Sequence, residues 1–359
     1  MPYECCMNAR LTNDLSRQLK HPYVTTSCDA TNCYDAINHI VLAFLLLAIT
    51  CWRGAVVSLL SPIQIMRFFQ RTAFGDSATF MGGPDRETFL QGICQGNGAG
   101  PACWLMLSSA LIHCYRKRGG GAKIISPISR AIISFIGTMF VDDTDLVSWL
   151  PNLTDAKKCF RDMQGSCLLW GTLLCASGGR FKPEKCYWSL IDYVCTDGEW
   201  EYASMEPLEM LIPMPDGSFE TIEQVDVHEP KEMLGVWACP AGDDTKHLEE
   251  KVIGRFTKWI TRTKNGHLPS KFAWVSYRFK LWAGVRYGLA TLATPLAVAQ
   301  ELLRDTEFKT LSFLGVNKNI KREWRTLPRS FGGVGLFSFP IEQMICWLNM
   351  IIQHFGVPS

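Results

Sequence analysis

Short apolar runs bounded by turn-forming residues alternate along this chain with longer apolar stretches, a pattern that mixes strands with helices. Residues 131–140 are apolar, and residues 146–150 form a second apolar run after a few small polar residues. This arrangement predicts a β-hairpin with Asp142 and Asp143 at its tip. A further β-prone run at residues 24–28 predicts another strand.

Helical patterns account for most of the remaining chain. Predicted helices cover part of residues 1–23, then residues 33–53, 56–72 with an interruption at Pro62, 104–115, 154–175, 248–263, 271–303 and a last segment after residue 335. Residues 33–53 include an apolar stretch that we expect to be buried on most faces. The intervening predictions are turns at 73–85 and 116–123, a strand through residue 191, an acidic β-hairpin insertion at 192–230, and a short strand or turn at 231–237.

Three carboxylates fall at predicted strand ends. Asp29 ends the strand at residues 24–28, where it can face Asp142 and Asp143. Adjacent carboxylates at buried strand ends repel one another and lose hydration, and a divalent cation removes that cost. An ordinary Asp-rich turn is the alternative. Carboxylates from two strand ends also suit a two-metal site for in-line phosphoryl displacement.

The charge of the chain is small overall but unevenly distributed. The 359 residues are 47% hydrophobic and 19% charged with a formal net charge of +2, which excludes a disordered chain and allows two or three subdomains. Residues 192–244 hold fourteen acids and one lysine, whereas residues 245–330 hold seventeen Lys and Arg and six acids. The basic segment is a candidate nucleic-acid face, with a solvated helical surface as the alternative.

Fifteen cysteines are scattered along the chain, and no CxxC pair is present to hold zinc. We expect reduced thiols in an intracellular protein, nuclear or cytoplasmic. The apolar runs at residues 40–52 and 102–112 are too short to span a bilayer, so we expect no membrane partner.

A glycine-rich segment at residues 91–101 precedes the predicted helix at 104–115. Its glycines allow positive φ values and close backbone approach to a ligand. The segment matches neither GxxxxGK[ST] nor GxGxxG, so a nucleotide-binding P-loop is not indicated. A phosphate-holding loop and a plain connector both remain open.

Five motifs stand in a fixed order along the chain: DATNCYD at 29–35, CQGNGAGPA at 94–102, FVDD at 140–143, GGRFKPEKC at 178–186 and MLGVW at 233–237, with a weaker sixth, MNARLTND, at 7–14. In sequence and order they resemble the palm and thumb of a reverse transcriptase of the non-LTR retrotransposon type. FVDD resembles the [FY]xDD catalytic loop, and the usual Ser before Pro in the second block is Gly100 here. Together the blocks cover roughly residues 5–240.

The resemblance implies an α+β fold of the polymerase right-hand type. It implies a fingers remnant at residues 1–23, a palm with an antiparallel sheet and helices at 24–240 carrying the 192–230 insertion, and a mainly helical basic thumb at 241–359. Fingers would be only partial, so the chain resembles a fragment or decayed copy of a longer mobile-element protein. We expect it to polymerise poorly or not at all in isolation.

The resemblance also implies catalytic roles. Asp29 and Asp142 would hold two Mg²⁺ ions, for which Mn²⁺ can substitute, with Asp143 in support and the Ala30 carbonyl as a further ligand. One ion would lower the pKa of the primer 3′-hydroxyl and the other would neutralise charge on the leaving pyrophosphate. Lys185 would lie near that pyrophosphate, with a plain surface lysine as the alternative.

Further residues would contact nucleotide and nucleic acid. Tyr34 would exclude a 2′-hydroxyl and so favour dNTPs, unless it is a core tyrosine, while Gln95 and Gly96 would lie against the templating base and the incoming nucleotide. The primer end would rest on Leu234 and Gly235. Basic helices would hold the RNA template and DNA primer through phosphates, with Lys251, Arg255, Lys258 and Arg262 as candidates.

The aromatic residues of the basic segment can stack on bases or belong to the core, namely Trp259, Trp274, Tyr277 and Trp282. Two other functions remain open for the whole chain. One is a non-catalytic nucleic-acid-binding remnant, and the other is an RNA-directed RNA polymerase, against which Tyr34 argues.

Overall fold

The computed structural model describes residues 2–49, 51–84, 87, 90–118, 121–126, 129–149, 155–204 and 207–354. The chain divides into two compact units. Leu19–Asp226 form one, here called the sheet unit, and Met1–Gln18 with Val227–Ser359 form the other, here called the helical unit. Within the described ranges, every helix is too short or too polar to traverse a bilayer.

A six-stranded sheet forms the centre of the sheet unit. Its strands follow the order β11 (Met210–Pro213), β12 (Phe219–Gln224), β8 (Tyr187–Ile191), β1 (Tyr23–Asp29), β7 (Asp143–Ser148) and β6 (Gly137–Phe140). Neighbouring strands are antiparallel except β12 and β8, which are parallel. The predicted all-antiparallel sheet is therefore wrong at this pair. Part of the predicted 192–230 insertion also returns to extend the sheet instead of projecting as a separate hairpin.

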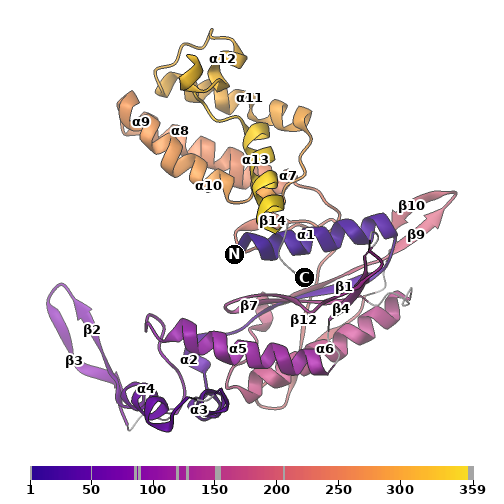
Figure 1. Cartoon of the computed structure of the whole chain (residues 1–359), viewed down its shortest axis with the longest axis vertical. Coiled ribbons are helices and arrows are strands. Elements are labelled where there is room, and N and C mark those ends of the chain that lie inside the picture. The colour runs from indigo at the N-terminus through magenta and orange to yellow at the C-terminus, as the bar shows by residue number, and fades with distance from the viewer. Residues whose placement is uncertain are drawn as a thin grey trace. The chain divides into compact units, whose positions relative to one another are not determined.

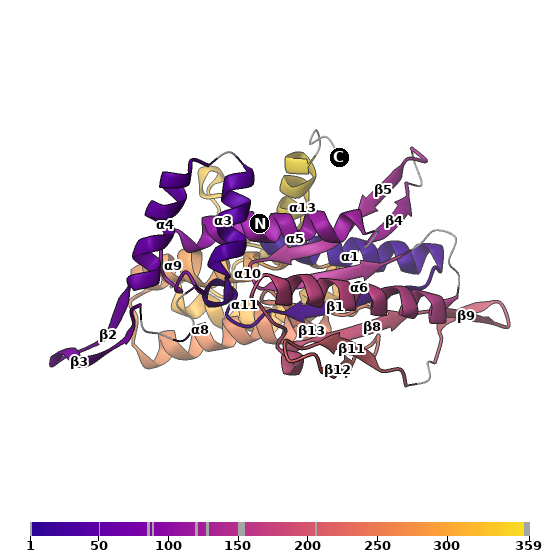
Figure 2. The same cartoon turned by 90° about the horizontal axis from the view of Figure 1, so that it is seen from below.

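The two faces of β1 differ because successive side chains point to opposite sides of a strand. Val24, Thr26 and Cys28 are buried, whereas Thr25, Ser27 and Asp29 are only partly so. Helices α5 (Gly100–Lys117) and α6 (Ala156–Ala176) run along one face of the sheet (Figures 1 and 2). Val24 and Cys28 share a core with side chains of these helices, so Asp29 lies on the opposite face of the strand.

The predicted helices around these motifs are present. Residues 104–115 lie in α5 and residues 156–175 in α6, whereas residue 154 of the predicted helix lies outside the described residues. Helix α6 ends at Ala176, followed by Ser177 as its C-cap and by Gly178 with a φ of 99°. The predicted strand ending at residue 191 is β8, preceded by the short helix η1 (Pro183–Lys185). After it, β9 (Tyr193–Thr196) and β10 (Glu199–Tyr202) form a hairpin of their own.

The apolar run at residues 131–140 is not one strand. β5 (Ile132–Phe135) pairs with β4 (Ala122–Ile125) in a separate two-stranded sheet, and only β6 continues toward the acidic pair. Gly137 begins β6 with a φ of 145°, and any β-carbon there would overlap the Asp145 carbonyl. The break follows from this close approach, which only glycine permits. The predicted turn at 116–123 is shortened, because α5 extends to Lys117 and β4 begins at Ala122.

The predictions for residues 33–85 are partly wrong. The expected helix at 33–53 is divided into α2 (Cys33–Ala36) and α3 (His39–Ala48), because Asn38 lies between them and its side chain caps α3. Helix α4 (Arg53–Ile65) runs through Pro62 without interruption. The expected end of that helix and the expected turns after it instead form a hairpin, β2 (Arg67–Thr72) and β3 (Gly75–Gly82), whose flanking glycines and aromatic residues suit strands.

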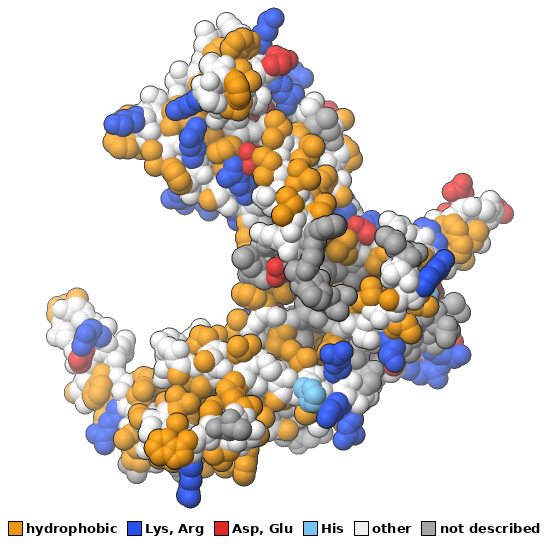
Figure 3. Space-filling model, viewed as in Figure 1, with side chains coloured by type: hydrophobic (Ala, Val, Ile, Leu, Met, Phe, Trp, Pro, Cys, Tyr) orange, Lys and Arg blue, Asp and Glu red, His pale blue; other side chains and the backbone are white. Residues whose placement is uncertain are grey.

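Helices α3 and α4 are also not buried on most faces. Only His39, Leu42 and Leu46 of α3 are buried. Figure 3 shows hydrophobic side chains gathered over these two helices. Exposed members of that surface are Ile40, Phe44, Leu47, Val57 and Ile65.

Helices dominate the second unit. They are α1 (Pro2–Leu19), α7 (Thr245–His247), the π-helix η2 (Leu248–Ile253), α8 (Gly254–Asn265), α9 (Ser270–Ser276), the π-helix η3 (Tyr277–Leu281), α10 (Trp282–Arg286), η4 (Leu289–Thr291), α11 (Leu296–Phe313), α12 (Arg322–Thr326), η5 (Arg329–Phe331) and α13 (Phe339–His354). A hairpin of β13 (Lys231–Met233) and β14 (Val236–Ala238) accompanies them. The single helix predicted at 271–303 is therefore interrupted between α10 and α11.

Aromatic residues fill the core of the helical unit. Trp259, Tyr277 and Trp282 are buried, and Trp274 packs against the same cluster. This packing places all four rings in the core, and the small exposed part of Trp259 also lines a cavity of this unit. Helix α1 joins this unit through Arg10, whose Nη1 lies 2.7 Å from Asp244 Oδ1. The assignment of residues 1–23 to a fingers remnant stays a prediction.

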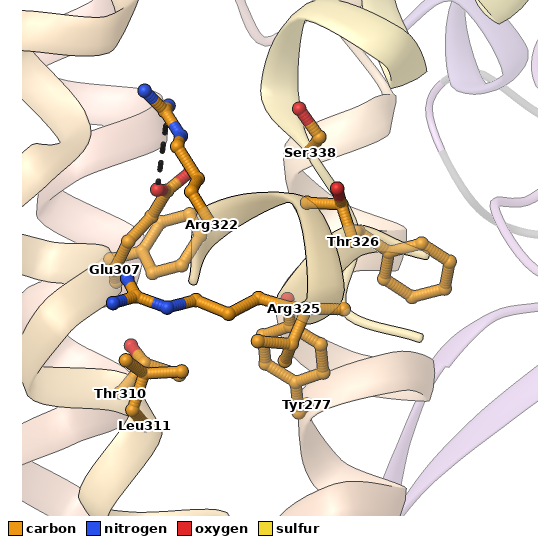
Figure 4. Close-up of a pocket in the computed structure, with 11 residues that line it drawn as sticks. Tyr277, Glu307, Thr310, Leu311, Arg322, Arg325, Thr326 and Ser338 are labelled. Atoms are coloured by element: carbon orange, nitrogen blue, oxygen red, sulfur yellow. Dashed lines mark ion pairs between the residues drawn. The ribbon is translucent and has the colours of Figure 1, made fainter. Parts of the chain in front are cut away.

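A small cavity lies beside this core. Figure 4 shows Arg322 and Arg325 approaching Glu307, with Tyr277 below them. Its volume is about 30 Å³, which is room for one or two water molecules. Arg322 Nη2 lies 3.9 Å from Glu307 Oε2, so the basic side chains here already have an acid.

Candidate active site

Strand register places the acidic residues of three motifs together. In the β1–β7 pair, Asp29 is directly opposite Asp143. In the β6–β7 pair, Phe140 is opposite Asp143, so Val141 and Asp142 form a two-residue hairpin loop. Residues more than 110 positions apart in the sequence thus meet at one end of the sheet. Their catalytic roles stay predictions.

Lys185 adds a cation to this group. Its Nζ lies 3.0 Å from Asp29 Oδ2, and the lysine side chain is 54% exposed against 15% for the aspartate. The hydrogen bond from Lys185 to Asp29, followed by the charge of Asp29, raises the pKa of the lysine. Backbone bonds fix the aspartate from the same segment, because the Lys182 N–H donates to the Asp29 carbonyl over 2.9 Å. The ion pair makes Lys185 a partner of the acidic group, and its expected place near a pyrophosphate stays a prediction.

The acids are close enough to affect one another. Burial raises the pKa of Asp143 most, and the charges of Asp142 and Asp29 raise it further, while Lys185 opposes them. Crowded carboxylates of this kind are stabilised by a cation, and carboxylate oxygens are ligands that Mg²⁺ prefers. As they stand, however, the described residues include no group of three or more His, Cys, Asp or Glu side chains placed to hold a metal ion.

The side chain of Trp104 holds the hairpin loop through a hydrogen bond. Val141 has a φ of 58°, which is strained for a β-branched residue. The Trp104 Nε1–H of α5 donates to the Val141 carbonyl over 2.7 Å, and the Ala30 N–H donates to the Asp142 carbonyl over 3.1 Å. The motifs did not single out Trp104, since nothing near it in the sequence marks a contact with the loop.

The glycine-rich segment packs on α2. The Ile93 N–H donates to the Tyr34 carbonyl over 2.9 Å, and the Gln95 N–H donates to Asp35 Oδ1 over 3.1 Å. The half-buried Tyr34 ring contacts the α5 start, where a β-carbon on Gly100 would lie 3.4 Å from it. This position leaves the sugar-facing role of Tyr34 a prediction.

Gly96 has a φ of 94°, and among the described residues no atom beyond its two chain neighbours lies within 4 Å of the place where its β-carbon would stand. The backbone conformation therefore requires glycine, whereas the space beside it is open. Gln91, which the motifs did not include, anchors the segment by donating from Nε2 to the carbonyls of Ala36 and Gly178. The contacts expected of Gln95 and Gly96 with base and nucleotide stay predictions.

The primer-supporting candidates lie in the helical unit. Leu234 and Gly235 form the tight turn between β13 and β14, with φ values of 49° and 84°. The Tyr287 hydroxyl donates to the Leu234 carbonyl over 2.7 Å and holds this turn. No feature of the MLGVW motif pointed to Tyr287, which lies 53 residues away.

The four basic candidates separate into two groups. Lys251 forms an ion pair with Glu232 of β13. Arg255, Lys258 and Arg262 instead lie along a cavity of the helical unit. Only these three are placed to meet an anionic ligand as they stand.

No protein-family model and no curated protein matches this chain. Solved structures that match include an apo telomerase from Candida tropicalis truncated from its C-terminal domain, at 15% identity and a TM-score of 0.34, covering 60% of this chain and 39% of that one. Another is telomerase from Candida albicans in complex with a TWJ fragment of telomeric RNA, at 11% identity and a TM-score of 0.34, covering 99% of this chain and 52% of that one. The chain thus spans about half or less of the length of these proteins. Similarity at this level establishes neither the fold nor the function of this chain.

Proposed function

We propose that this chain is the catalytic part of a retrotransposon-like RNA-directed DNA polymerase, which extends a DNA primer on an RNA template with dNTPs. The observation that carries the proposal is the register of β1 and β7, which sets Asp29 opposite Asp143 and beside the loop residue Asp142. Two-metal nucleotidyl transfer needs carboxylates from separate strands to lie close together. The protein itself takes little part in the covalent chemistry. The ordered motifs, and the palm, thumb and partial fingers that they imply, agree with this arrangement.

Each residue then has a defined task. Asp29 and Asp142 would hold two Mg²⁺ ions with help from Asp143 and the Ala30 carbonyl. When bound, such ions supply charge that activates the primer 3′-hydroxyl and neutralises the leaving pyrophosphate. Trp104 keeps the Val141–Asp142 loop in its strained conformation, which would limit how far the loop backbone moves while the carboxylate side chains turn to bind metal.

In the structure, Lys185 forms an ion pair with Asp29, with 3.0 Å between the lysine Nζ and the aspartate Oδ2. We infer that its ammonium neutralises the acidic group when no metal is bound and turns toward phosphate when nucleotide arrives. The same ion pair favours the second candidate function, a nucleic-acid-binding remnant without catalysis. In that case Lys185 would replace the metal permanently.

Primer extension on an RNA template with Mg²⁺ tests the proposal. We expect weak extension by the unmodified chain and a loss of about a hundredfold or more in Asp142→Ala, because a metal ligand is removed. Asp197→Asn is the matched control, since Asp197 is an exposed turn residue with a φ of 53° that asparagine accepts. Binding of Mn²⁺ followed by electron paramagnetic resonance gives a readout that does not require turnover.

The remnant function predicts a different result. Nucleic acid would bind in a salt-sensitive manner with the same affinity in the unmodified chain, Asp29→Asn and Asp142→Ala, and neither Mn²⁺ binding nor extension would be detected. That combination would replace the polymerase proposal.

Tyr34→Ala separates DNA synthesis from RNA synthesis. If the Tyr34 ring excludes the 2′-hydroxyl, the variant gains ribonucleotide incorporation by about tenfold or more relative to deoxynucleotide incorporation. Incorporation ratios are measured with each nucleotide alone and in competition. An unmodified chain that already prefers ribonucleotides would instead support an RNA-directed RNA polymerase.

A further inference from the structure

A larger cavity lies between α8 and η3 in the helical unit, whereas the carboxylates belong to the sheet unit. Its volume is about 330 Å³, in the range of pockets that bind small ligands. Its walls combine basic side chains with an apolar floor. The residues that matter for its chemistry are Arg255, Lys258, Arg262 and Lys280 for the charge, and Trp259 and Leu281 for the floor.

The charges converge from two helices. Arg255, Lys258 and Arg262 are spaced by three and four residues, so they share one side of α8. Lys280 comes from η3 and lines the same cavity. No acid lines the cavity, and none of these four cations has an ion pair in the part of the chain that the structure describes. Four like charges around one space repel each other, and a bound anion relieves that repulsion.

The contrast with the small cavity of Figure 4 is direct. There, Arg322 and Arg325 surround Glu307, and about 30 Å³ remains. In the larger cavity, the described residues supply no corresponding acid and about tenfold more space is left. An external anion is the group that would complete this cavity.

The floor is apolar and held in place. Trp259 and Leu281 are 7% and 3% exposed. The Trp259 Nε1–H donates to Ser276 Oγ over 2.9 Å, which fixes the indole relative to α9. Only a small part of this floor is exposed, and an aromatic base can contact that part while its phosphate reaches the cations.

We propose that this cavity binds one nucleotide, with the phosphate held by Arg255, Lys258, Arg262 and Lys280 and the base packed on Trp259 and Leu281. The nucleotide is either free or one unit of a nucleic-acid strand. The site rests in part on the proposed function, which already assigns Arg255, Lys258 and Arg262 to nucleic acid, but no step at Asp29, Asp142 or Asp143 is needed for it.

Isothermal titration of the full chain with AMP, in EDTA at low salt, tests the binding. Orthophosphate and adenosine, titrated separately, report the two halves of the ligand. We expect AMP to bind at least about tenfold more tightly than either half, because charge-assisted bonds and base packing then act together. Equal affinity for AMP and orthophosphate, or no AMP binding at millimolar concentration, would refute the nucleotide site.

Two charge-matched double variants locate the site. Lys258→Gln with Arg262→Gln removes two cations of the cavity, whereas Lys264→Gln with Lys271→Gln removes two exposed cations of α8 and α9 outside it. We expect about a tenfold or greater loss of AMP affinity in the first and less than twofold in the second. Equal losses in both would show a general charge effect and overturn the proposal.

A third variant guards against loss of folding. Gly284 contacts Arg255 so closely that a β-carbon would overlap the guanidinium. Gly284→Ala therefore displaces Arg255 without changing charge, and we expect AMP affinity to fall about threefold while circular dichroism stays unchanged. Unchanged AMP affinity in this variant, together with unchanged affinity in the first double variant, would also overturn the proposal.

Competition distinguishes the two sources of the nucleotide. A twelve-nucleotide deoxythymidine strand that displaces AMP stoichiometrically assigns the cavity to one unit of a strand. A strand that binds elsewhere and leaves AMP in place assigns it to a free nucleotide. These experiments contain EDTA, so a failure of the polymerase proposal leaves their results unchanged.

Discussion

At the scale of single residues, the loop that carries Asp142 is held by a bond from another part of the chain. Val141 adopts a φ of 58°, and the Trp104 Nε1–H donates to its carbonyl over 2.7 Å. Ring packing of Trp104 and this one hydrogen bond can be separated experimentally, because phenylalanine keeps most of the packing and loses the donor.

We expect Trp104→Phe to cost about 1–2 kcal/mol of folding free energy and to lower primer extension by about tenfold or more. The larger effect on activity follows from misplacing Asp142 by a fraction of an ångström. Urea unfolding and single-turnover extension measure the two quantities. A variant whose extension falls only in proportion to its folded fraction would show that Trp104 is merely a core residue. Trp170→Phe is the matched control, since Trp170 is buried at 3% exposure in the same core.

Residues with a charge at a strand end could be found from the sequence. Asp29 and Asp143 follow from their position after β-prone runs, and the register of β1 with β7 places them opposite each other. Trp104 and Gln91 could not be found this way, because an aromatic or amide side chain gives the same sequence pattern whether it fills a core or holds a loop. The resemblance singled out Lys185 but placed it near the pyrophosphate, and its ion pair with Asp29 was not predicted.

At the scale of elements, the β13–β14 hairpin depends on a buried histidine. The Trp237 N–H donates to His247 Nδ1 over 3.1 Å, so the ring is neutral and accepts at that nitrogen. Burial, followed by the charges of Lys251 and Arg255, lowers the pKa of His247 to about 4, while Glu232 opposes them. Because its pKa is lower in the folded state than in the unfolded state, the histidine contributes stability at pH values above the unfolded-state pKa. This stability is lost as the pH falls toward the folded-state pKa.

We therefore expect the helical unit to lose about 3 kcal/mol between pH 6.5 and pH 4 through His247 alone. His247→Gln keeps an acceptor for Trp237 and should flatten this part of the profile, even though it is less stable at pH 7. His267→Asn, at an exposed turn, is the control with an unchanged slope. Hydrogen exchange of the β13–β14 amides reports the unit directly. Parallel pH profiles for the unmodified chain and His247→Gln would exclude the histidine as the cause.

Long periodic elements could be predicted, and short ones could not. Helices α5 and α6 have a buried side that recurs every three to four residues, which a strand cannot reproduce. The β2–β3 hairpin was missed because its strands are exposed on most positions and show no alternation. The break at Asn38 was missed because the apolar pattern continues across it and only the cap marks the helix start.

At the scale of the whole chain, two associations of distant segments were not predicted. Strand β12 pairs in parallel with β8, and residues 1–18 group with residues 227–359. The local sequence patterns of these segments do not indicate that they associate. The charge asymmetry could be predicted, because composition is read from the sequence without knowing which segments pair. The excess of cations after residue 244 falls in the helical unit.

The charge asymmetry leads to a prediction about how nucleic-acid affinity depends on salt concentration. Binding to each phosphate releases counterions, so the slope of log K against log salt becomes shallower by about 0.9 for every duplex-DNA phosphate that a variant no longer neutralises. Lys251 is already paired with Glu232, whereas Lys258 and Arg262 have no ion pair among the described residues. If nucleic acid binds along α8, Lys258→Gln and Arg262→Gln each reduce the slope by about 0.9, and Lys251→Gln leaves it nearly unchanged. Fluorescence anisotropy of a labelled RNA–DNA hybrid, measured over a series of KCl concentrations, gives the slopes, and equal reductions in all three variants would mean that only net charge matters.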